Sequence, residues 1–132
     1  MLDWWDELIG STAVGIGQSN AELKKWYRKL NAKFFNGDLP DNVLLQWATP
    51  EQEPDIASCE PRSDGTNCYK LLFNRLKNPT KTLLLSAMLH ELVHIATKYK
   101  DNHGPAFDAW HKRLVRRGAF KKGAIIPDVT LF

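Results

Sequence analysis

The spacing of apolar residues predicts a first helix that begins near Ser19 or Asn20. Its apolar positions recur three and four residues apart, on one helix face opposite a row of lysines: Leu23, Trp26, Tyr27, Leu30 and Phe34. Residues 19–22 have the spacing of a capping box, in which Ser19 and Glu22 satisfy free backbone N–H groups. Asn36-Gly37 supplies a helix stop, and we expect the helix to belong to the core.

Two more helices are predicted in the second half of the chain. One begins at Thr80 or Thr82 and runs to about Thr97, and it is apolar nearly all round, which is typical of a buried helix. Asp101-Asn102 separates it from a last helix, which is predicted from about Pro105 to Arg117. The inward face of this last helix is predicted to comprise Phe107, Trp110, Leu114 and Val115.

Three short apolar runs between the helices predict strands over Val43–Trp47, Ile56–Glu60 and Cys68–Asn74. Residues 63–67 carry turn chemistry, so the last two strands are expected to form a hairpin. Helices packed beside such a small sheet, which includes an antiparallel pair, make an α+β fold. The hairpin would bring Cys59 near Cys68, and we expect two reduced thiols rather than a disulfide.

The composition is that of one ordinary globular domain, with 132 residues, of which 43% are hydrophobic and 25% charged. We expect residues 1–18 to be an appendage and residues 19–132 to form the domain. No apolar run approaches the roughly 20 residues of a membrane span. No Lys or Arg precedes Lys24, so a secretory signal is not expected. These features indicate a cytoplasmic monomer.

The net charge of +3 is unevenly distributed. Residues 38–64 carry seven acids and one arginine, whereas residues 24–33 carry five basic residues and no acid. Residues 112–122 carry six basic residues without an acid: Lys112, Arg113, Arg116, Arg117, Lys121 and Lys122. Either basic segment could follow the phosphate backbone of DNA, or it could be a solvated helix face. The sequence leaves both interpretations open.

The predicted buried helix contains His90-Glu91-Leu92-Val93-His94. Two histidines four apart lie on one helix face and can bind one Zn²⁺ ion. Glu91 lies about a third of a turn away, where its carboxylate can meet a water molecule bound to the zinc. The metal lowers the pKa of this water, Glu91 takes the proton, and the resulting hydroxide attacks a carbonyl group. This pattern therefore indicates a zinc hydrolase with Glu91 as its catalytic residue.

Chance would produce this five-residue pattern in roughly one chain in 200 of like composition, so its surroundings matter. Three ionisable side chains interrupt an otherwise apolar helix, where burial without a ligand would be costly. His103 lies at the start of the next helix, where the chain can fold back over the first two histidines and supply a third protein ligand. The fourth coordination position of the zinc ion is then left for water. His111 is the competing third ligand, although it shares a stripe with Phe107 and is better suited to packing.

This segment, followed after eight residues by His103-Gly104-Pro105-Ala106-Phe107, resembles the SprT-like family of zinc metallopeptidases. The family includes the Spartan-type proteases that digest proteins crosslinked to DNA. Residues 30–40, followed by Leu45-Gln46-Trp47, resemble its opening helix and first strand. The similarity covers about residues 20–117.

The resemblance implies a zincin-like domain whose active-site helix carries His90, Glu91 and His94, with His103 completing the zinc site. It also implies hydrolysis of peptide bonds, often in DNA-associated proteins and stimulated by DNA. Many relatives append a zinc ribbon, for which this chain's two cysteines are too few. The first candidate for DNA contact is therefore the basic segment 112–122.

Two other functions remain open at this point. A zinc-containing module could hold DNA or a protein partner without cutting it, although a purely structural site would not need Glu91 and usually has four protein ligands. Alternatively, a zinc hydrolase of this size could cut an amide bond in a non-protein substrate such as peptidoglycan.

Overall fold

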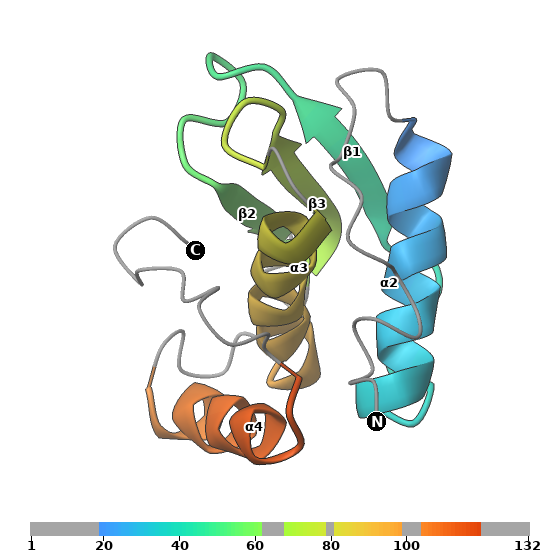
Figure 1. The fold of residues 1–132 in the computed structure, drawn as a ribbon, viewed down its shortest axis with the longest axis vertical. Helices are drawn as coiled ribbons and strands as arrows, with labels where there is room; N and C mark the ends of the chain where they lie inside the picture. The colour runs from blue at the N-terminus through green and yellow to red at the C-terminus, as the bar shows by residue number, and fades with distance from the viewer. Residues whose placement is uncertain (1–18, 62–67, 79–80, 99–103, 120–132) are drawn as a thin grey trace.

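The computed structural model describes residues 19–61, 68–78, 81–98 and 104–119, which form three helices and a small sheet (Figure 1). Helix α2 spans Asn20–Phe34, α3 spans Lys81–Ala96 and α4 spans Pro105–Arg116. The strands are β1 (Leu44–Ala48), β2 (Ala57–Pro61) and β3 (Cys68–Asn74). The predicted α+β class is therefore confirmed, and each strand lies within one residue of its predicted bounds.

The sheet is mixed and has the order β1-β3-β2. β3 pairs in parallel with β1 and antiparallel with β2, so the predicted hairpin partners are adjacent. The sequence did not predict the parallel pair, because it joins segments more than twenty residues apart in the chain. β2 and β1 form the two edges of this sheet.

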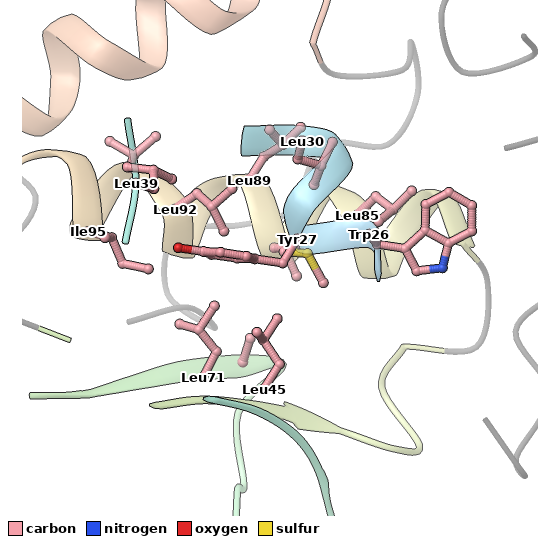
Figure 2. Close-up of a cluster of buried hydrophobic side chains, with 14 of the residues drawn as sticks. Trp26, Tyr27, Leu30, Leu39, Leu45, Leu71, Leu85, Leu89, Leu92 and Ile95 are labelled. Carbon is pink, nitrogen blue, oxygen red and sulfur yellow. The ribbon is translucent and has the colours of Figure 1, made fainter. Parts of the chain in front are cut away.

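The core lies between the sheet and helices α2 and α3 (Figure 2). Tyr27 of α2 lies between leucines of α3, including Leu92, and Leu71 of the sheet. Its ring is fully buried, and its hydroxyl donates to the carbonyl oxygen of Pro40 at 2.6 Å. Helix α3 is covered by α2, the sheet and α4, which explains why its sequence is apolar nearly all round.

The end of α2 is fixed by both its backbone and Asn31. Asn36 and Gly37 have φ angles of 54° and 74°, and the Gly37 N–H donates back to the Asn31 carbonyl at 3.0 Å. The buried Asn31 amide donates to the Leu39 carbonyl and accepts from the Leu39 N–H, each at 3.1 Å. The segment 30–40 therefore holds the chain in a tight turn that leads into β1.

Two sequence predictions about single residues are wrong. Val115 is 55% exposed, because α4 buries Phe107 and Leu114 while Val115 lies on the outer side of the helix. Cys59 is disulfide-bonded, although the compartment argument favoured reduced thiols. The sequence has one other cysteine, Cys68. The antiparallel pairing places Cys68 opposite Pro61, which follows Cys59 by two residues. Closeness across the hairpin is therefore the feature that the prediction underweighted.

Candidate metal centre

Helix α3 carries three ionisable side chains into the interior of the protein. His90 is 3% exposed, and Glu91 and His94 are fully buried. Their neighbours along the helix, Leu89, Leu92 and Val93, are also fully buried. Burying such groups costs free energy unless hydrogen bonds, charges or a metal compensate them, so this cluster is a candidate for function.

The two histidine rings lie side by side on one face of α3. Their ring centroids are 5.2 Å apart and their planes are inclined by 73°. Two imidazoles bound to one tetrahedral zinc, with Zn–N bonds of about 2.0–2.1 Å, would have centroids about 5 Å apart. The donor types and their spacing therefore fit a zinc ion held by His90 and His94.

Phe107 of α4 closes one side of this pair. Its ring centroid lies 4.8 Å from that of His90 and 4.7 Å from that of His94. The first turn of α4 positions Phe107 for this contact. Gly104 caps the helix and Pro105 occupies its first turn. The Asp108 N–H donates to the Gly104 carbonyl at 2.9 Å. The first turn of α4 thus places an apolar ring against both imidazoles.

Glu91 follows His90 directly and is about a third of a turn from it around the helix. Its carboxylate is fully buried on the same helix that carries the imidazole pair.

Comparison with known proteins identifies a family. The family model of the SprT-like family matches residues 23–124, which is most of the chain. The chain belongs to the SprT-like family. No curated protein and no solved structure gives a significant match. The SprT-like match begins in the first turn of α2 and covers the rest of that helix, the whole sheet, α3 and α4, and it includes His90, Glu91 and His94.

The sequence of this SprT-like chain also predicts His103 as a zinc ligand. This residue lies outside the described residues. Among the residues that the structure describes, no three His, Cys, Asp or Glu side chains form a metal-binding group. His111 is half-buried and stacks on Phe107, with ring centroids 6.1 Å apart and planes inclined by 17°. A packing role for His111 agrees with this contact.

The basic residues of α4 in the SprT-like domain have different surroundings. Lys112 pairs with Asp108 at 3.0 Å, and the guanidinium of Arg113 lies 4.5 Å from the centroid of the Trp110 ring. Arg117 donates to backbone carbonyls at the end of α2. Lys121 and Lys122 lie outside the described residues. Four of the six predicted basic residues therefore lie on α4 or at its C-cap.

Two site features were missed by reading the sequence. Phe107 was predicted only as a core residue, because its contact with the histidines depends on how α4 packs against α3. The hydrogen bonds of Arg117 join positions more than eighty residues apart and have no local signal in the sequence.

In the part of the chain that the structure describes, no helix is long and apolar enough to cross a membrane.

Proposed function

We propose that this chain is a zinc-dependent metallopeptidase with a zincin-like core, and that α3 is its active-site helix. Its substrates are proteins associated with DNA or crosslinked to it. The observation that carries the proposal is the buried pair of imidazoles, at zinc-binding separation, next to the buried carboxylate of Glu91. Membership of the SprT-like family, which is generally associated with metallopeptidase activity, supports it.

His90 and His94 would hold the zinc together with His103. Zinc, when bound, supplies a Lewis acid that lowers the pKa of a water molecule and polarises the scissile carbonyl group. Glu91 accepts the proton of the attacking water and then donates it to the leaving amine. The apolar ring of Phe107, which contacts both imidazoles, helps to exclude bulk water and so strengthens these charge interactions.

The test compares wild type with Glu91→Gln, using a basic DNA-binding protein as substrate, with and without single-stranded DNA. Removing a general base typically costs 10²- to 10⁴-fold in rate, so we expect hydrolysis to fall at least about 100-fold. Zinc content should remain near one ion per chain, because the predicted histidine ligands are unchanged. Equal turnover by Glu91→Gln would remove Glu91 from the mechanism.

Glu53→Gln is the matched control. Glu53 is also a buried glutamate, and its carboxylate accepts a hydrogen bond from the Ser58 hydroxyl at 2.6 Å, outside the α3 cluster. We expect this variant to keep its activity, because an amide oxygen can still accept that bond. If wild-type protein with bound zinc cuts no protein under any condition, a non-catalytic zinc module or a non-protein amide substrate becomes the better explanation.

A further inference from the structure

The C-terminal end of α4 is attached to the C-terminal end of α2 through Arg117. Its guanidinium donates to the carbonyl oxygens of Phe34 at 3.0 Å and of Lys33 at 2.9 Å, and it lies 5.2 Å from the centroid of the Phe34 ring. Both helix ends lie at the lower end of the molecule in Figure 1. Arg117 thereby satisfies two carbonyls that the end of α2 leaves without partners within the helix.

A second contact extends this junction along α4. Trp110 stacks on Phe35, with ring centroids 5.1 Å apart and planes inclined by 26°. Arg113, which is exposed, lies on the Trp110 ring. The aromatic pair therefore holds the basic side of α4 next to the residues that follow α2.

The junction brings together the ends of two basic segments that are far apart in the sequence. We define the α2–α4 basic surface by six residues: Lys25, Lys29, Lys33, Arg113, Arg116 and Arg117. Five of them are exposed and Lys29 is half-buried. Lys25 and Lys29 both lie over Trp26, with their Nζ atoms 5.7 and 4.8 Å from its ring centroid.

Among the described residues, the acids near these basic side chains in the sequence are Glu22, Asp38, Asp41 and Asp108. Asp41 is engaged by Arg28 at 2.9 Å, and Asp108 is engaged by Lys112. Asp38, in the turn after α2, is the exposed acid nearest in sequence to Lys33. From Lys25 to Lys33 the stripe extends about 12 Å along α2, which is long enough for more than one phosphate group of an extended strand.

Helix stabilisation accounts for only part of this arrangement. Cations near the C-terminus of a helix interact favourably with its dipole, which explains Arg117, Arg116 and Lys33. It does not explain Lys25, which lies in the N-terminal half of α2. A membrane-binding helix would need an apolar face beside the charges, and in the described part of α4 the large exposed apolar side chain is Val115 alone.

We propose that the α2–α4 basic surface binds the phosphate backbone of a nucleic-acid strand. Phe107, which contacts the imidazole pair, precedes Arg113 on α4 by six residues, or about 9 Å along the helix. A protein attached to the bound strand would then be presented close to the α3 site. This last step rests on the proposed peptidase function, whereas binding of the strand does not.

The experiment measures fluorescence anisotropy of a labelled 20-nucleotide DNA, single-stranded and duplex, with the zinc-loaded full chain at several salt concentrations. In Lys33→Gln/Arg116→Gln we expect binding of single strands to weaken about tenfold. The slope of log K against log salt should fall by about 1.4, since each lost phosphate contact contributes about 0.7 for single strands. Arg75→Gln/Lys77→Gln, which also removes two positive charges but lies after β3, is the matched control and should bind within twofold of wild type.

Equal weakening in both double variants would overturn the proposal, because net charge rather than this surface would then govern binding. An unchanged affinity in Lys33→Gln/Arg116→Gln would overturn it as well. So would binding to phosphatidylserine vesicles without binding to either DNA. Hydrolysis by the wild-type protein, measured beside this titration, separates the two proposals: if wild type cuts no substrate while the strand still binds, only the proposed function is contradicted.

Discussion

Phe107 is the residue that links the candidate metal centre to the packing of the helices around it. Its ring contacts both imidazoles of α3 and stacks with His111 of α4. A histidine ligand binds metal tightly only when its ring is held in the binding orientation, and neighbouring groups commonly provide that restraint. Phe107 is therefore a positioning residue in the proposed site.

Replacing Phe107 by Ala should weaken metal binding by about 10- to 100-fold, the range typical of lost supporting contacts around a metal site. The measurement is a titration with Co²⁺, followed by the visible absorption of the bound ion. Phe107→Leu restores part of the apolar contact and should recover part of the affinity. Val115→Ala, on the exposed side of the same helix, is the control and should bind like wild type. Unchanged affinity and spectrum in Phe107→Ala would show that the ring serves stability alone.

At this scale the sequence predicted the burial of α3 better than it predicted the residues that pack against it. The spacing of His90, Glu91 and His94 places all three on one helix, and the structure confirms that this helix is buried. Their contact with Phe107 depends on the angle at which α4 crosses α3, which no local spacing encodes. The position of Val115 was wrong for the same reason, because periodicity gives a helix face but not its width.

Among the elements, the helices were predicted closely because each has a long periodic pattern and clear ends. Ser19 caps α2 by accepting from the Glu22 N–H at 3.3 Å, as the capping pattern indicates. The observed bounds of the strands differ from the predicted bounds by one residue at most, but the order of the strands in the sheet did not follow from the sequence. In the sheet β3 lies between β1 and β2 and pairs with both. The sequence of a short apolar strand does not indicate which other strands it pairs with.

Tyr27 connects α2 to the segment that leads into β1, and it makes that connection sensitive to pH. Burial, with a smaller contribution from Asp41, raises the pKa of the Tyr27 phenol well above its usual range. The folded state therefore keeps the phenol protonated at a pH where the unfolded chain would ionise. A group with a raised pKa contributes stability that is complete below the unfolded pKa and is lost as pH increases above it.

We expect Tyr27→Phe to be about 1 kcal/mol less stable than wild type near neutral pH, because the hydrogen bond to the Pro40 carbonyl is lost. Above about pH 10 this difference should shrink, since wild type alone loses the contribution of a protonated Tyr27. Urea unfolding of both proteins between pH 7 and 11 measures it. Lys24, whose pKa is lowered by burial, is present in both chains and cancels in the comparison. A difference that stays constant with pH would contradict this account.

For the molecule as a whole, the proposed zinc site should couple metal binding to stability. Helices α3 and α4 pack together next to the candidate site. A metal ion bound there would therefore stabilise the folded protein as a whole. Metal at about 1,000 times its dissociation constant adds about 4 kcal/mol to the free energy of unfolding. In a chain of 132 residues, each kcal/mol moves the melting temperature by roughly 4 °C.

Zinc in slight excess should therefore raise the melting temperature by more than about 10 °C, and a chelator should reverse the shift. The His94→Ala and His103→Ala variants should both lose it, because each lacks a predicted ligand. His111→Ala should keep it, since the His111 ring stacks on Phe107. Loss of the shift in His111→Ala, with retention in His103→Ala, would assign the third ligand to His111 instead. A shift that survives in His94→Ala would mean that zinc stabilises the protein elsewhere, and the imidazole pair on α3 would then need another explanation.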